Sequence, residues 1–133
     1  MHTQRRRNAG LFDDGLGNWE SQLRKGSLSL AVLATLCDGR LYGVEIRCRL
    51  AQIAGFTVAE GVIYPILRRL GKMGFVEAEW VEPDVGHPRR YFRLSASGRR
   101  YVLELSRTWN EFAGGMNRVL AASGGRTHDQ PPS

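Results

Sequence analysis

GVIYPILRRLGKMG, residues 61–74, carries an apolar row and a cationic row at the spacing of an α-helix. Side chains three and four positions apart share a helix face, which predicts a buried row of Val62, Ile66, Leu70 and Met73. The opposite side carries Arg68, Arg69 and Lys72, with Tyr64 one turn before Arg68. This arrangement favours a recognition helix, which docks one face on a core and presents the other to a nucleic-acid groove. An ordinary core helix with a solvated basic face is the alternative for such a stripe taken alone.

The whole chain has the size and charge of one small basic domain. Its 133 residues are enough for a single core, and 19 Lys and Arg against 13 Asp and Glu give a net charge of +6. Such an excess favours a polyanionic partner. No apolar run approaches the length of a membrane span, and no apolar block follows Arg5–Arg7 as it would in a signal peptide. We therefore expect a cytoplasmic protein without a membrane partner.

Residues that could carry catalysis or hold a metal are scattered. Cys37 and Cys48 fall inside predicted helices with no clustered histidine beside them, so we read them as small, reduced core residues. The histidines, at positions 2, 87 and 128, all lie in predicted loops or tails. No nucleophile elbow, phosphate-cradling glycine loop or metal spacing is visible. We expect neither an enzyme nor a cofactor.

The chain before the basic helix is predicted to be helical after a short arm. Residues 1–17 are polar and glycine-rich, and we expect a flexible arm whose Arg5–Arg7 cluster either touches phosphates or stays solvated. A first helix is predicted from the N-cap Asn18, with a pause at Gly26-Ser27, to Leu36. Residues 28–36 are almost entirely apolar, which is typical of an interior helix.

A second helix is predicted from Tyr42-Gly43 to Ala54, with Gly55 as its left-handed cap. The residues expected to point inward are Val44, Ile46, Leu50, Ala51 and Ile53. Two helices before a third with a basic face form the helix-turn-helix pattern. Pro65 lacks the N–H that a helix interior needs, so the third helix either starts late or is kinked, and we expect it to start near Val62.

Residues 75–94 have the alternation of a β-hairpin. Residues 75–82 place Val76, Ala78 and Trp80 on one face and two glutamates, at positions 77 and 79, on the other, which reads as a solvated edge. A loop rich in turn residues leads to a second strand over 89–94, with Phe92 and Leu94 inward. Residues 89–100 hold five arginines and no acid. A hairpin of this kind directly after a recognition helix is a wing, and its cations fit contact with backbone phosphates.

The last predicted helix starts at the cap Ser95 and ends near Ala122, before a polar tail over 123–133 that we expect to be disordered. Its apolar positions follow a heptad pattern: Val102, Leu105, Trp109, Phe112, Met116 and Val119. A helix this exposed at the end of a small domain favours pairing with a second copy, and we predict a homodimer through these residues. Burial against the first helix of the same chain is the alternative.

The order of elements and several local strings resemble the PadR family of winged-helix transcriptional regulators. The strings are LYGVEI at 41–46, VIYPILRRL at 62–70, PRRYFRL at 88–94, and the glycines at 74 and 98. The resemblance implies a dimeric repressor whose third helix enters the major groove, whose wing meets backbone or minor groove, and whose last helix crosses to the partner. It places Tyr64, Arg68, Arg89 and Arg90 against DNA. The family often has Ser or Thr just ahead of the Tyr-Pro pair, whereas this chain has Gly61 and Val62.

The predicted fold is mostly α with a small β wing: a winged helix-turn-helix domain over residues 18–94 plus a C-terminal dimerisation helix over 95–122. The predicted DNA-binding residues are Tyr64, Arg68, Arg69, Lys72, His87, Arg89, Arg90 and Tyr91, and the partner is double-stranded DNA with a palindromic operator. Trp109 and Phe112, one turn apart, are candidates for binding a small apolar or aromatic effector, with simple packing as the alternative. A winged-helix module that binds protein instead of DNA remains the alternative function; its binding would be insensitive to salt.

Overall fold

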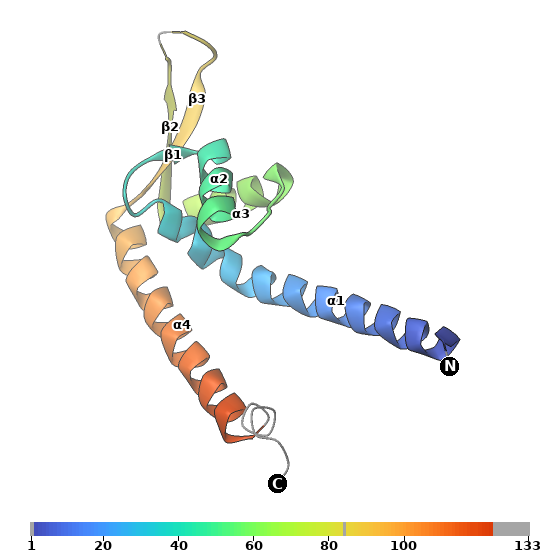
Figure 1. Ribbon diagram of the computed structural model, residues 1–133. Helices are drawn as coiled ribbons and strands as arrows, with labels where there is room; N and C mark the ends of the chain where they lie inside the picture. The colour runs from blue at the N-terminus through green and yellow to red at the C-terminus, as the bar shows by residue number, and fades with distance from the viewer. Residues whose placement is uncertain (1, 84, 124–133) are drawn as a thin grey trace.

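The computed structural model describes residues 2–83 and 85–123, with side chains from residue 15 onward, and has the winged-helix fold. Its elements are α1 (His2–Thr35), β1 (Leu41–Tyr42), α2 (Gly43–Ala54), α3 (Glu60–Lys72), β2 (Val76–Val81), β3 (Arg89–Leu94) and α4 (Ala96–Ala122). In Figure 1, α2, α3 and the sheet gather into one body. The hairpin of β2 and β3 projects from it on one side, and α1 and α4 leave it as two diverging arms. No helix of the described residues is long and apolar enough to cross a membrane.

Helix α1 differs from the prediction at its N-terminal end. It is continuous from His2 to Thr35, through the segment for which we predicted a flexible arm, past the expected N-cap Asn18 and through the expected pause at Gly26-Ser27. No proline occurs in residues 1–35; glycine weakens a helix by roughly 1 kcal/mol each but removes no backbone donor. The C-terminal part belongs to the core as expected, because Leu28, Val32 and Leu33 are buried.

Helix α2 has the predicted bounds but a narrower buried face. Gly55 ends it with φ 71° and ψ 18°, the left-handed cap that was expected. Only Gly43, Ile46 and Leu50 are buried along this helix. The other predicted inward residues, Val44, Ala51 and Ile53, are exposed, so this part of the prediction was wrong. The predicted core position of the two cysteines was also wrong, since Cys37 and Cys48 are both exposed, free cysteines.

Helix α3 starts two residues earlier than predicted and buries a different face from the predicted one. It begins at Glu60, so Pro65 is its sixth residue and lies inside the helix. Because Pro65 and Gly61 are both exposed, the Gly61 carbonyl that loses its donor can be satisfied by water. The buried face consists of Ile63, Ile66, Leu67 and Leu70. Val62 and Met73 are 45% and 51% exposed, contrary to the predicted row, because the buried residues at i, i+3, i+4 and i+7 leave them at its margins.

The sheet has the order β1–β3–β2 and is antiparallel throughout. The two-residue strand β1 was not predicted; it pairs Leu41 with Phe92 and Tyr42 with Tyr91. Val76, Phe92 and Leu94 are buried as expected. Ala78 and Trp80 are exposed instead, because the hairpin extends beyond the helices that cover its base (Figure 1).

Helix α4 begins on the body and then leaves it. Its cap Ser95 accepts a hydrogen bond from the Gly98 N–H at 3.0 Å, as predicted, and donates one to the Gly74 carbonyl at 2.6 Å. Of the predicted dimer residues, Val102 is buried in the core of its own chain and Leu105 packs against that core. Those lying farther along α4 are exposed: Trp109, Phe112, Met116 and Val119. The predicted disordered tail, after Ser123, lies outside the described residues.

Candidate nucleic-acid interface

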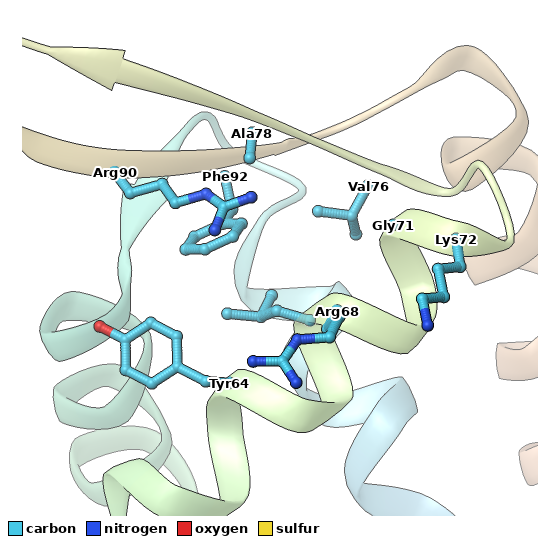
Figure 2. Close-up of a pocket in the computed structure, with 9 residues that line it drawn as sticks. Tyr64, Arg68, Gly71, Lys72, Val76, Ala78, Arg90 and Phe92 are labelled. Atoms are coloured by element: carbon cyan, nitrogen blue, oxygen red, sulfur yellow. The ribbon is translucent and has the colours of Figure 1, made fainter.

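A groove of about 450 Å³ runs between α3 and the sheet. Helix α3 contributes Tyr64, Arg68 and Lys72 to its walls, and β3 contributes Arg90. The floor is apolar and includes Leu67, Val76, Ala78 and Phe92. Figure 2 shows the guanidinium groups of Arg68 and Arg90 reaching toward one space from opposite walls, with the Tyr64 ring beside them. The structure therefore brings four of the eight predicted DNA-binding residues together.

The cations of this groove have no acidic partners among the described residues. The ion pairs of the described residues all use arginines outside the groove: Arg40, Arg47, Arg49 or Arg93. The charges of Arg68, Lys72 and Arg90 are thus not neutralised by carboxylates of the described residues, and all three side chains are exposed. Such a wall attracts phosphates and similar anions.

Tyr64 is held in place by two neighbours. Its ring lies 6.4 Å from the ring of Phe92, centroid to centroid, and on its other side it crosses the start of α2 at Gly43. A Cβ atom on residue 43 would stand 2.5 Å from the Tyr64 hydroxyl oxygen and 2.8 Å from the ring carbon that bears it. Gly43 is therefore a site residue that the sequence analysis missed. Its one signal was its place in the LYGVEI string, which does not reveal what it contacts.

The wing residues separate onto two faces because strand side chains alternate. Arg90 shares the groove face with Phe92, whose ring lies 5.6 Å from the Arg90 guanidinium carbon. Tyr91 points to the outer face, where it is half-buried, its ring 5.4 Å from that of Tyr42 and 4.9 Å from the guanidinium carbon of Arg40. Tyr91 therefore lies outside the groove, contrary to its expected place on an exposed basic surface.

The remaining predicted residues also lie outside the groove. Arg69 follows Arg68 in the sequence but turns toward α1, where it donates a hydrogen bond to the Ser29 hydroxyl oxygen at 2.8 Å. His87 is exposed in the loop between the two wing strands. The guanidinium carbon of Arg89 lies 4.7 Å from the centre of the Tyr42 ring. Among the five arginines of residues 89–100, Arg93 is paired with glutamates, so the positive surface is smaller than the sequence suggested.

An ion-pair network braces the outer face of the hairpin. Glu79 accepts a hydrogen bond from Arg40 at 2.9 Å and lies 3.3 Å from Arg93, which also approaches Glu77 at 3.6 Å. The hydrogen bond from Arg40, with the nearby charge of Arg93, lowers the pKa of the Glu79 carboxyl below its usual value. Both glutamate side chains remain accessible to solvent, as the predicted solvated edge requires, and in addition they pair with arginines.

A second hollow, of about 490 Å³, lies between α1 and α4. Trp109 and Phe112 line it together, as the effector prediction requires, and Leu23, Leu105 and the stem of Arg69 lie around them. The walls of this hollow are mainly apolar.

No group of three or more His, Cys, Asp or Glu that could hold a metal ion occurs in the part of the chain described.

Comparison with known proteins decides the family. Residues 32–104 match the Transcriptional regulator PadR-like family, and that match spans α2, α3, the whole wing and the start of α4. The chain belongs to this family. The match ends before Trp109, so the exposed half of α4 lies outside it, as does most of α1.

One curated transcriptional regulator is similar in sequence, and solved PadR structures are similar in fold. Transcriptional regulator Rv3488 of Mycobacterium tuberculosis is 29% identical over 107 residues, which cover 80% of this chain and 92% of that protein. The crystal structure of a PadR family transcriptional regulator from Eggerthella lenta is 29% identical, with a TM-score of 0.74, over 83% of this chain and 96% of the other. Bacillus subtilis PadR, solved in complex with operator DNA, is 24% identical with a TM-score of 0.54, over 59% of this chain and 44% of that one, and shows the shared fold.

Proposed function

We propose that this PadR-like transcriptional regulator is a sequence-specific DNA-binding repressor that acts as a homodimer. The observation that carries the proposal is the groove between α3 and β3, where Arg68, Lys72 and Arg90 face one space beside Tyr64 and form no ion pair with any described carboxylate. A further support is that a chain of the same fold, Bacillus subtilis PadR, was solved with operator DNA. The arrangement suits a duplex, because it combines cations for phosphates with a row of side chains on a helix narrow enough for the major groove.

Helix α3 supplies the base contacts in this proposal. Tyr64, Arg68 and Lys72 are spaced four residues apart, so they form one row along the helix. Arg68 is at the middle of the row, and its planar guanidinium can donate two hydrogen bonds to one guanine edge. Arg90 reaches from the opposite wall of the groove and neutralises a phosphate.

The two arms support the homodimer. Trp109, Phe112, Met116 and Val119 form an exposed apolar stripe on α4. Helix α1 exposes Leu16, Trp19 and Leu23 at helical spacing. A second copy covers both stripes at once, and its two-fold symmetry presents two α3 helices to a palindromic operator with half-sites about one or two helical turns apart.

The hollow between α1 and α4 supports release by a small effector. Its mainly apolar walls and the rings of Trp109 and Phe112 suit a planar aromatic molecule. A compound of this kind that weakens DNA binding by the unaltered chain, but not by Trp109→Ala, would support the assignment. A screen of planar aromatic compounds in which none shifts the DNA affinity would count against it.

Selection of bound sequences from a random pool of DNA duplexes tests the function directly. The chain is expected to enrich one palindromic sequence. Arg68→Ala is expected to weaken binding to that duplex by about 1–3 kcal/mol and to relax its sequence preference. Arg90→Ala is expected to weaken all sequences evenly and to reduce the slope of log affinity against log salt by about 1.

Arg107→Ala is the matched control, because it removes the same charge from an exposed position on α4, outside the apolar stripe. Its affinity for the selected duplex is expected to stay within about twofold of the unaltered chain. No enriched sequence, or binding that does not respond to salt, would favour a protein-interaction module instead. Equal losses in Arg68→Ala and Arg107→Ala would show that general charge, rather than this groove, determines the affinity.

A further inference from the structure

Trp80 stands exposed on the wing. It is 69% exposed, although it sits within β2, where the alternation of the strand predicts an inward residue. In the register of the hairpin Trp80 lies opposite Arg90. Residues directly opposite in an antiparallel pair point to the same face of the sheet, so Trp80 lies on the face that looks toward α3. It is a large apolar side chain on the proposed DNA side of the molecule, with little of its own chain covering it.

Trp80 lines a hollow of about 380 Å³ with Tyr42, Tyr64, Pro88, Arg89 and Arg90. Two of these residues, Tyr64 and Arg90, also form walls of the cationic groove. The hollow is therefore a continuation of that groove toward the tip of the wing. Arg89 reaches it beside the Tyr42 ring, which its guanidinium carbon approaches at 4.7 Å.

The lining combines two chemistries that a nucleic-acid strand also combines. Arg89 and Arg90 provide positive charge, and no carboxylate lines the hollow within the part of the chain described. The rings of Trp80, Tyr42 and Tyr64 provide flat apolar surface. In a DNA strand, each phosphate is joined to a deoxyribose whose C–H groups present an apolar surface. A cationic wall next to an aromatic wall is complementary to that repeat.

We propose that this hollow holds one sugar–phosphate strand of duplex DNA, with the indole of Trp80 packed against a deoxyribose and Arg89 and Arg90 paired with the flanking phosphates. The inference rests on the proposed DNA-binding function and adds a residue to it. A second copy of the chain is the other occupant that an exposed tryptophan suggests. The two arginines beside Trp80 favour a polyanion over another strongly basic chain, whose net charge is +6.

The chain has three tryptophans, at positions 19, 80 and 109. Tryptophan fluorescence reports on Trp80 alone once the other two are replaced. The reporter chain carries Trp19→Phe and Trp109→Phe, which keep an aromatic ring at both positions of the proposed dimer stripes, and its affinity for the selected duplex is measured before the quenching experiment. Acrylamide is the quencher, since it is neutral and phosphates do not change its local concentration. On saturation with the duplex selected by the unaltered chain, the quenching constant of Trp80 is expected to fall at least about twofold. A control chain with Trp80→Phe and Trp109→Phe reports on Trp19 of α1. In the proposed homodimer the surroundings of Trp19 are the same with and without DNA, so its quenching is expected to stay unchanged.

Affinity gives a second, independent readout. Trp80→Ala is expected to weaken binding to the same duplex by about tenfold, in keeping with the area of an aromatic ring covered on binding. Since no charge is removed, the salt slope is expected to equal that of the unaltered chain, unlike that of Arg90→Ala. Trp80→Phe keeps an aromatic surface and is expected to recover most of the loss.

The outcomes separate this inference from the function on which it rests. Binding of the selected duplex with Trp80 still open to acrylamide, or with Trp80→Ala within about twofold of the unaltered chain, would overturn the Trp80 contact and leave the regulator proposal intact. A Trp80→Ala variant that changes oligomeric state in sedimentation would overturn it in favour of the second copy. If the unaltered chain binds no duplex, both proposals fail together.

Discussion

Arg68 and Arg69 are identical side chains on consecutive residues, and the structure gives them different surroundings. Each residue turns an α-helix by about 100°, so Arg68 faces the groove whereas Arg69 reaches the Ser29 hydroxyl on α1. The sequence showed that this helix has a basic side but could not show which of the two arginines faces the groove. That division depends on which face α1 covers, and α1 lies far away in the sequence.

Arg69→Ala tests whether only Arg68 of the two arginines contacts DNA. The variant is expected to bind the selected duplex within about twofold of the unaltered chain, because its guanidinium is turned away from the groove. Arg68→Ala, one position earlier and with the same loss of charge, is the comparison. Titration of both variants at several salt concentrations measures the difference. Losses of equal size in the two variants would mean that α3 meets DNA through another face.

Gly43→Ala addresses how Tyr64 is positioned. The new methyl group would stand 2.5 Å from the Tyr64 hydroxyl oxygen, so the ring must move. We expect the affinity for the selected duplex to fall by about 1 kcal/mol, or roughly fivefold, although residue 43 does not line the groove. Gly26→Ala, in helix α1, is the matched control, because a Cβ atom at residue 26 would meet no atom within 4 Å. An unchanged affinity in Gly43→Ala would show that Tyr64 does not contribute to binding.

At the scale of the elements, the sequence predicted what local chemistry determines and missed what packing determines. The bounds of α2, β3 and α4 were confirmed, since Gly55 and Ser95 cap the two helices and the strand alternates clearly. Strand β1 has two residues and no local signal; only its pairing with β3 makes it a strand. The buried face of α3 was misplaced because apolar residues occur on both sides of that helix, and tertiary contacts choose between them.

Gly98 shows how an element's position depends on one close approach. A Cβ atom on residue 98 would collide with the carbonyl group of Phe75, at the turn where α4 docks beside the start of β2. Gly98→Ala is expected to lower the free energy of unfolding by about 1–3 kcal/mol, measured by urea denaturation. Gly114→Ala, farther along α4, would meet only a flexible arginine end at 3.4 Å. It is expected to raise stability by up to about 1 kcal/mol. Equal effects of the two changes would rule out the close approach as the cause.

The molecule as a whole leaves apolar residues of both α1 and α4 uncovered by its own chain. Figure 1 shows α1 and α4 diverging from the body. The apolar residues of the two stripes are exposed. The stripe on α4 continues beyond the chain's own core, since Leu105 is the last heptad position that packs against the core cluster. The sequence shows that the heptad positions of α4 are apolar. It could not show where intramolecular packing stops, because Val102 and Phe112 occupy similar positions in the pattern.

Phe112→Asp tests whether the exposed half of α4 joins two copies. Phe112 is 63% exposed in one chain, so the change is expected to leave the fold intact while placing a carboxylate in the apolar stripe. The unaltered chain is expected to sediment as a dimer and the variant as a monomer. Because a monomer engages one half-site, its affinity for the palindromic duplex is expected to fall by at least about a hundredfold. Leu103→Asp, 66% exposed on α4 but outside the stripe, is the control and is expected to remain dimeric with full affinity. A monomeric unaltered chain, or a Phe112→Asp variant that still forms dimers, would contradict dimerisation through α4. In either case the expectation of a palindromic operator would no longer follow from this interface.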